Sequence, residues 1–144
     1  MGADAILVRV EALDAIRTVL LGRGDVLLAY VFGSAARDQT RPSSDLDIAV
    51  VFERPLGARE LDRLATALEA AAGRRVDLVT LETAPPLLAH EVIATGRLVL
   101  CRDEDLRVGF EARVAARYLD SARLRRVQHA YLRERAEAHR AGSS

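Results

Sequence analysis

The first apolar positions of the chain follow the spacing of an amphipathic helix. Apolar residues recur every three or four positions from Ile6 to Leu20, and Gly22 and Gly24 come directly afterwards. Side chains with this spacing share one face of a helix, and glycine commonly ends such a pattern. The pattern predicts an N-terminal helix with Asp4 as its N-cap.

Short continuous apolar runs follow, and helical spacing returns between and after them. Runs of five to seven residues bounded by Gly, Pro and polar residues are typical of buried strands. The predicted strands are 26–32, 46–52, 75–81 and a weaker 97–101; the predicted helices lie between Gly57 and Gly73, between Pro85 and Gly96, and from about Asp103 onward.

This order of elements predicts one α/β (α+β) domain with a short mixed β-sheet flanked by helices. The length of 144 residues suits a single domain, 1–144, with a core at about 26–101. A long C-terminal helical segment is expected at about 103–140. No internal repeat is present.

Composition excludes several classes of function. The chain has 21 basic and 21 acidic residues, so a uniformly basic coat for nucleic acid is not expected. All the basic residues are arginine, which excludes a Schiff-base lysine and a P-loop lysine. Aromatic residues make up 4% and tryptophan is absent, which argues against stacking on single-stranded nucleic acid. Direct nucleic-acid binding is therefore not expected.

The zero net charge is the sum of two opposed segments. Residues 1–106 carry 12 arginines and 17 acids, a balance of −5, and residues 107–144 carry 9 arginines and 4 acids, a balance of +5. The basic segment is either a solvated helix face or a docking surface for a partner, and the sequence favours neither.

Nothing in the sequence indicates a membrane protein or a disulfide framework. The lone Cys101 has no internal partner and is expected to pack in the core, and the apolar runs are too short to span a bilayer. The N-terminus lacks the basic region of a signal peptide. A cytoplasmic location is expected.

Three acidic residues interrupt positions where a strand would otherwise be apolar. Asp45 and Asp47 lie two apart at the start of the second strand and so point to one face, while Asp77 interrupts the third strand. If these strands are neighbours, three carboxylates converge. Like charges at close range repel unless a cation lies among them, and Mg²⁺ is the hard ion that carboxylates and phosphate oxygens bind.

Gly33 and Ser34 directly follow the first strand. Glycine lets a phosphate approach the backbone, and serine offers an N–H and a hydroxyl at what resembles the start of a helical turn. Alone, this pair would be read as a structural turn, and the two aspartates alone could equally cap a strand. The combination of strand, Gly33-Ser34, ten residues, Asp45-x-Asp47, strand and Asp77 favours a metal site that handles phosphate.

These residues carry a resemblance to a known family. The segment VFGSAARDQTRPSSDLDIAVVF resembles the G-S-x(10)-D-x-D signature of the polymerase-β-like nucleotidyltransferase superfamily, with Asp77 at the position of its third acid. The small size resembles the minimal nucleotidyltransferases (MNT). The RVDLVTL run and a closing F-E-x-R…Y-L-D helix at 110–120 resemble the MNT antitoxins of HEPN/MNT toxin–antitoxin pairs.

The resemblance implies an enzyme that uses Mg²⁺ to transfer AMP from ATP to a tyrosine of a partner HEPN ribonuclease toxin, which is thereby silenced. It implies a homo-oligomer or hetero-oligomer as possible assemblies. It also implies roles for six residues: Gly33, Ser34 and Arg37 bind the triphosphate, Asp45, Asp47 and Asp77 ligate metal, and Asp77 helps deprotonate the acceptor.

Two other functions stay open. The acceptor could be a small hydroxylated molecule of the aminoglycoside type, although the chain has no second substrate-binding domain. The chain could also be a catalytically silent antitoxin that neutralises by binding alone, although all three acids are present. The spacing Arg123, His129, Tyr131 superficially resembles a HEPN ribonuclease motif, but a HEPN bundle would not fit in the tail. His90 and Arg41 are expected to have structural or solvated roles.

Overall fold

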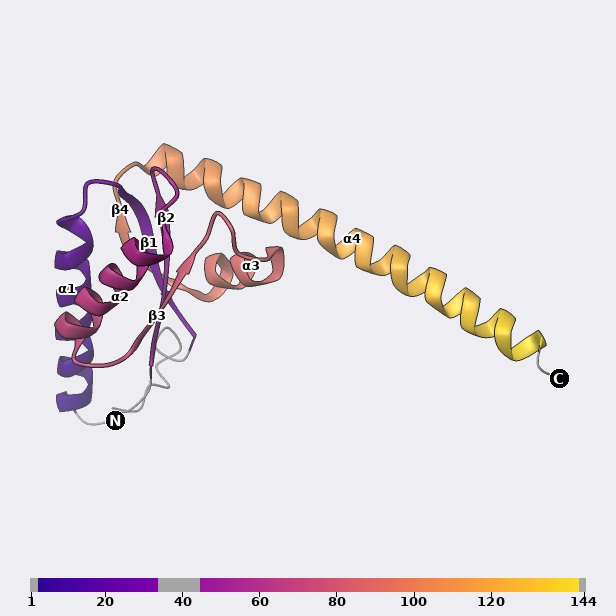
Figure 1. The fold of residues 1–144 in the computed structure, drawn as a ribbon, viewed down its shortest axis with the longest axis horizontal. Coiled ribbons are helices and arrows are strands. Elements are labelled where there is room, and N and C mark those ends of the chain that lie inside the picture. The colour runs from indigo at the N-terminus through magenta and orange to yellow at the C-terminus, as the bar shows by residue number, and fades with distance from the viewer. Residues whose placement is uncertain (1–2, 34–44, 143–144) are drawn as a thin grey trace.

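A computed structural model describes residues 3–33 and 45–142, and the side chains from residue 10 onward within those ranges. Helices and strands follow one another in the predicted order (Figure 1). The helices are α1 (Ala3–Leu21), α2 (Ala58–Ala72), α3 (Pro86–Thr95) and α4 (Glu104–Gly142), and the strands are β1 (Val26–Phe32), β2 (Leu46–Phe52), β3 (Val76–Thr80) and β4 (Arg97–Cys101).

The strands form one mixed sheet in the order β3-β2-β1-β4. The β1 strand pairs antiparallel with both β2 and β4, whereas β2 and β3 are parallel. The predicted mixed α/β architecture is therefore confirmed. Because β2 and β3 run in the same direction and pair from their first residues, both of their N-terminal ends lie at one end of the sheet.

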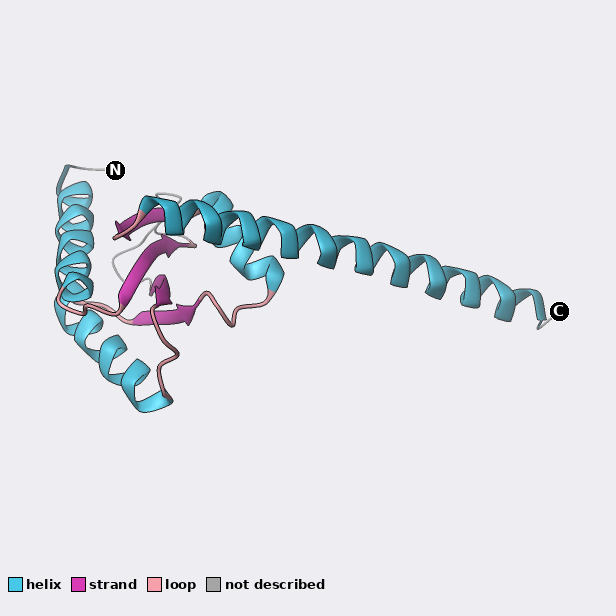
Figure 2. Cartoon of the chain, turned by 90° about the horizontal axis from the view of Figure 1, so that it is seen from above, coloured by secondary structure: helices cyan, strands magenta, loops and turns pink. Residues whose placement is uncertain are grey.

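Helices cover both faces of the sheet, with α1 and α2 on one and α3 and α4 on the other (Figures 1 and 2). Successive residues of β2 alternate between two cores. Ile48 and Val50 face the core under α1 and α2, while Ala49 and Val51 face the core under α3 and α4. Burial of both faces explains why the strand sequences are continuous apolar runs rather than alternating ones.

The α1 helix differs from its prediction in two details. It begins at Ala3, so Asp4 lies inside the first turn instead of capping it. Ile16 and Leu20 are fully buried as expected, but the Val10 side chain is 48% exposed. The predicted apolar stripe is therefore longer than the part of α1 that packs on the sheet.

Local signals account for most other boundaries. Gly73 ends α2 in the left-handed conformation, with φ of 69°, and its N–H donates to the Glu69 carbonyl. The Asp103 carboxylate accepts hydrogen bonds from the N–H groups of Asp105 and Leu106 at 3.0 and 3.3 Å, which caps α4. The β3 strand is one residue shorter at each end than predicted.

The α4 helix has 39 residues and is therefore about 58 Å long. Its first turns pack on the sheet, where Phe110 and Val114 are buried. The Tyr30 hydroxyl of β1 donates a 2.8 Å hydrogen bond to Glu111, whose carboxylate also pairs with Arg107. The second half of the helix reaches away from the α/β body (Figures 1 and 2).

None of the helices in the described part of the chain is both long and apolar enough to cross a membrane.

Candidate active site

The candidate site lies where β2 and β3 begin and β1 ends. Asp47, the second residue of β2, is opposite Phe32 of β1 and is directly beside Asp77 of β3. Paired residues of adjacent strands point to the same face of a sheet. The expectation that the two strands are neighbours is confirmed, and Asp47 and Asp77 are brought together.

The pKa of Asp47 is raised above its ordinary value by its surroundings. Partial burial is the largest cause, followed by the negative charges of Asp77 and Asp45 and by a hydrogen bond shared with the Asp77 carboxyl. Each of these disfavours the ionised form. A cation at this position would reverse the effect of the two neighbouring carboxylates.

Gly33 closes the other side of the Asp47 carboxylate. Its φ is 71°, in the left-handed region that residues with a Cβ rarely adopt. A Cβ on residue 33 would collide with Asp47 Oδ2 and would lie 3.4 Å from Asp47 Cγ. Glycine is therefore required here both for its backbone conformation and for the space that the carboxylate occupies.

The remaining predicted site residues are only partly placed. Asp45 is exposed and directly precedes β2. Ser34, Arg37 and the loop residue Arg41 lie outside the described residues, and the predicted phosphate-binding role of Ser34 and Arg37 stays a prediction.

Within the described ranges, no group of three or more Asp, Glu, His or Cys side chains is arranged to hold a metal ion, so the predicted convergence of all three carboxylates is not found and only Asp47 and Asp77 lie directly side by side. An ion that keeps several waters and is shared with a phosphate needs only one or two carboxylates from the protein, and Mg²⁺ behaves in this way. The Asp47–Asp77 pair fits such an ion because it supplies only oxygen ligands and sets two carboxylates side by side.

Two residues considered from the sequence have structural roles. The His90 ring stacks on the Tyr118 ring with centroids 3.8 Å apart, which joins α3 to α4. The Cys101 thiol donates to Glu104 at 3.2 Å, and burial raises its pKa, so it is not an activated thiolate.

Sequence reasoning did not single out Glu82. It directly follows the buried Leu81, where an acidic residue is ordinarily taken for a solvated loop residue. The Glu82 carboxylate instead accepts a 2.6 Å hydrogen bond from the Phe52 N–H at the far end of β2, and its Oε2 is buried without a hydrogen-bond partner among the described residues. Local sequence carries no signal for this contact, because the two residues are 30 positions apart.

The family model described as "Polymerase beta, Nucleotidyltransferase" matches residues 14–105 of this chain. The match contains Gly33 and all three acids. The chain belongs to this nucleotidyltransferase family. Membership agrees with the carboxylate pair at the start of β2 and β3 and confirms the resemblance inferred from the signature.

Two relatives are described as protein adenylyltransferases. MJ0435 of Methanocaldococcus jannaschii, for which that activity is an inferred assignment, is 37% identical over 75 residues, covering 52% of this chain and 80% of the relative. MntA of Shewanella oneidensis is 33% identical over 78 residues, covering 54% of this chain and 56% of MntA. The match therefore spans little more than half the length of MntA.

Solved structures with the same fold come from toxin–antitoxin complexes. A chain in the crystal structure of a toxin–antitoxin with AMP-PNP superposes with a TM-score of 0.74 and 26% identity, covering 83% of this chain and 97% of that one. A chain in the complex of a tri-AMPylated Shewanella oneidensis HEPN toxin with its MNT antitoxin gives a TM-score of 0.70 at 24% identity, covering 86% and 98%. The second likeness shows the fold alone.

Proposed function

We propose that this chain is an antitoxin that transfers AMP from ATP to a tyrosine hydroxyl of a partner HEPN-type toxin. The observation that carries the proposal is the pairing of Asp47 with Asp77, with Asp45 acting on the same carboxylate and Gly33 leaving space for it. The relatives described as protein adenylyltransferases and the toxin–antitoxin neighbours support the choice of acceptor.

The carboxylates Asp45, Asp47 and Asp77 are proposed to hold Mg²⁺. When bound, the ion neutralises charge on the triphosphate and on the leaving pyrophosphate. Gly33 keeps the end of β1 free of a side chain beside Asp47, so the phosphates can approach the backbone there. Ser34 and Arg37 are proposed to bind the phosphates, as the signature implies.

In the proposed reaction the phenolic oxygen of the acceptor tyrosine attacks the α-phosphorus of ATP. A bond forms between that oxygen and the phosphorus, the bond from the α-phosphorus to the bridging oxygen of the β-phosphate breaks, and pyrophosphate leaves. The phenol proton passes to a carboxylate, and Asp77 is proposed to accept it. Asp77 suits this role because it is exposed on β3 and can meet a macromolecular acceptor.

The test uses the full chain, Mg²⁺, labelled ATP and the product of the neighbouring reading frame as the candidate HEPN-type partner. We expect AMP on a tyrosine of that protein, identified by intact mass and peptide sequencing, and loss of transfer in the Asp45→Ala, Asp47→Ala double variant. A shift of the label to a panel of aminoglycosides would instead indicate a small-molecule enzyme.

Two further outcomes contradict the proposal. If the double variant silences the toxin as well as the unchanged chain does, neutralisation occurs by binding alone. If GTP, CTP or UTP supplies the transferred group in preference to ATP, the adenylyl assignment is wrong.

An Asp62→Asn variant is the control for the loss of negative charge. It removes a carboxylate from the exposed face of α2 and is expected to keep AMP transfer.

A further inference from the structure

One face of α4 continues from the body of the protein into the projecting half of the helix. The residues that define this face, here called the α4 seam, follow a spacing of four and three positions along the helix. This alternation keeps side chains on one side of an α-helix and is the spacing that lets a second helix pack against it. The α4 seam consists of Leu106, Phe110, Arg113, Arg117, Asp120, Leu124, Val127 and Tyr131.

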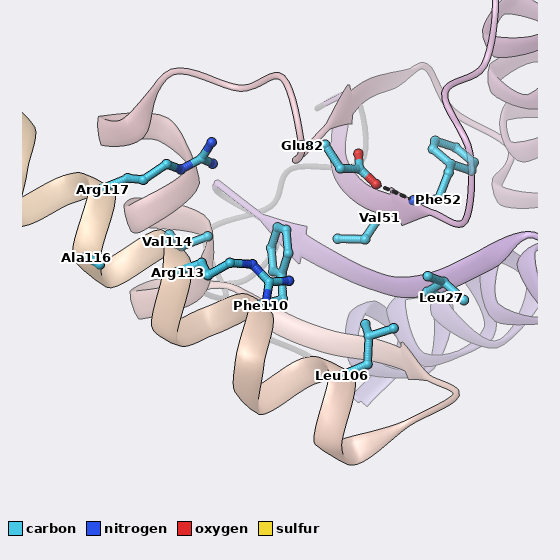
Figure 3. A pocket seen from close by; sticks show the side chains of 10 residues that line it. All are labelled: Leu27, Val51, Phe52, Glu82, Leu106, Phe110, Arg113, Val114, Ala116 and Arg117. Carbon is cyan, nitrogen blue, oxygen red and sulfur yellow. Dashed lines mark hydrogen bonds between the residues drawn. The ribbon is translucent and has the colours of Figure 1, made fainter.

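The first half of the α4 seam lines a cavity of about 500 Å³ at the end of the sheet away from the aspartates (Figure 3). Phe110 and Val51 contribute apolar walls, and Arg113 and Arg117 stand on the α4 side. On the opposite side lies Glu82, whose buried Oε2 has no hydrogen-bond partner in the part of the chain that the structure describes. The cavity is therefore apolar inside and has charged groups of both signs at its edge.

The second half of the seam is exposed. Leu124, Val127 and Tyr131 are 58%, 60% and 56% exposed, although they are large and lie at the three- and four-residue spacing of a packed face. This part of the helix projects beyond the body (Figure 1). Most helical stability in proteins comes from packing an apolar face, and no described part of the chain covers this one.

The charge around the seam decides which kind of molecule covers it. Residues 113–135 contain seven arginines and two acids. A second copy of the chain packed through the same segment would set an excess of five positive charges against another excess of five. The phosphates of a nucleic acid would contact the arginines, but they would leave Leu124, Val127 and Tyr131 of the α4 seam uncovered. An acidic amphipathic helix satisfies both features.

We infer that the α4 seam is the docking surface for an acidic amphipathic helix of the protein partner, with one end of that helix seated in the cavity beside Glu82. The inference rests on the proposed function only for the identity of the partner. Arg113 and Arg117 pair with acidic residues of the docked helix, and Leu124 and Val127 contact its apolar positions.

The experiment compares two double variants that add the same charge to the same helix. Leu124→Glu with Val127→Glu changes the α4 seam, whereas Leu119→Glu with Leu132→Glu changes residues that are 64% and 59% exposed on other sides of α4. Glutamate is a good helix former, so both variants keep α4 helical, which far-UV circular dichroism checks. Affinity for the candidate partner, the product of the neighbouring reading frame, is measured by isothermal titration calorimetry.

We expect the seam variant to raise Kd by at least about tenfold and the control variant by less than about threefold, because a few buried side chains dominate an interface. Hydrogen exchange at the amides of 119–135 is expected to slow when the partner binds the unchanged chain. Equal effects of the two variants, no effect of either, or no binding by the unchanged chain would overturn the inference.

Self-association is the other outcome to separate. In sedimentation velocity over a range of concentrations, the unchanged chain and the seam variant, each without partner, are expected to have the same sedimentation coefficient. A dimer that the seam variant abolishes would assign the surface to a second copy and overturn the inference.

AMP transfer is scored independently. Transfer to the partner that is equal in both variants, with unchanged affinities, rejects the docking surface and keeps the proposed function. Binding that depends on the α4 seam without any AMP transfer supports the docking surface and rejects the proposed function.

Discussion

The backbone of Gly33 lies so close to Asp47 Oδ2 that a Cβ at position 33 would collide with this oxygen. Glycine at the end of β1 is thereby tied to the carboxylate at the start of β2, across the antiparallel pairing of the two strands. A residue with a Cβ at position 33 would be strained at a φ of 71° and would displace the Asp47 carboxylate from its present position.

Gly33→Ala is expected to abolish AMP transfer and to lower the free energy of unfolding by about 1–3 kcal/mol, from backbone strain and the collision. Gly73 is the matched control. Its φ of 69° is nearly the same, but a Cβ at this position would have nothing within 4 Å of it. Gly73→Ala should therefore cost about 1 kcal/mol through strain alone and leave transfer intact. Urea denaturation and a transfer assay on both variants measure the difference; equal losses of activity would contradict it.

Asp47→Asn is expected to reduce AMP transfer by about 100-fold or more while making the metal-free protein slightly more stable. Because the pKa of Asp47 is raised in the fold, its ionised form is unfavourable there, and this cost grows as pH rises through and above the ordinary aspartate range. Removing the charge should raise the free energy of unfolding at pH 7 by up to about 0.5 kcal/mol, allowing for solvent screening.

Thermal unfolding in EDTA and in Mg²⁺ with a non-hydrolysable ATP analogue measures this effect. The unchanged chain should gain stability with the ligands, and Asp47→Asn should gain much less, because ligand binding to the folded state is what stabilises it. Asp62→Asn, on the exposed face of α2, should behave like the unchanged chain in both buffers. Lower stability of Asp47→Asn in EDTA would show that the carboxylate is stabilised by contacts other than those described.

The three candidate carboxylates could be picked out from the sequence because the signal for each of them is local. Strand alternation puts Asp45 and Asp47 on one face, and an acid inside the apolar run 75–81 is conspicuous. Periodicity could not show which strand lies next to β2. Asp47 lies beside Asp77 because β2 and β3 pair in parallel from their first residues. That pairing depends on α2, which returns the chain across the sheet.

The same limit applies to α4 and to Glu82. The spacing of Leu124, Val127 and Tyr131 shows that they share a face, but it does not show whether anything in the chain covers that face. Burial of Glu82 depends on the end of β2, 30 residues earlier. Periodicity reports which residues face together, whereas coverage and long-range polar contacts are properties of the folded chain.

Arg102 illustrates another such contact, and its substitution can be tested. Its guanidinium donates from Nε to the Val26 carbonyl at 2.6 Å and from Nη2 to the carbonyls of Leu21 and Arg23 at 2.9 and 2.8 Å. These acceptors lie at and beyond the end of α1, where helix carbonyls lack intrahelical partners. The planar guanidinium reaches three acceptors at once, which a lysine ammonium on a flexible chain does not reproduce.

Arg102→Lys should therefore lower the free energy of unfolding by about 1 kcal/mol, since the ammonium cannot replace all three hydrogen bonds of the guanidinium. Arg97→Lys, at an exposed position of β4, should change it by less than about 0.5 kcal/mol. Urea denaturation followed by circular dichroism compares the two. A loss of the same size in both variants would mean that the contacts of Arg102 with α1 contribute nothing specific.

Glu82→Gln is expected to stabilise the free chain at neutral pH. Burial is the main cause that raises the pKa of Glu82, and the hydrogen bond from the Phe52 N–H only partly opposes it. An acid with a raised pKa in the fold costs stability once it ionises. The cost is absent below the ordinary glutamate pKa and complete above the raised one. Glutamine keeps an oxygen for the Phe52 N–H and removes the unpaired charge.

The expected gain at pH 7 is up to about 1 kcal/mol after allowance for solvent screening, because the substitution removes the charge but leaves a polar amide in place of Oε2, and it should vanish near pH 4. Glu53→Gln is the control because it removes the same charge from an exposed position next to Phe52. Unfolding free energies at pH 4, 5, 6 and 7 measure both variants. A variant that is destabilised at pH 7, or whose gain does not depend on pH, would show that the buried carboxylate is compensated within the chain itself.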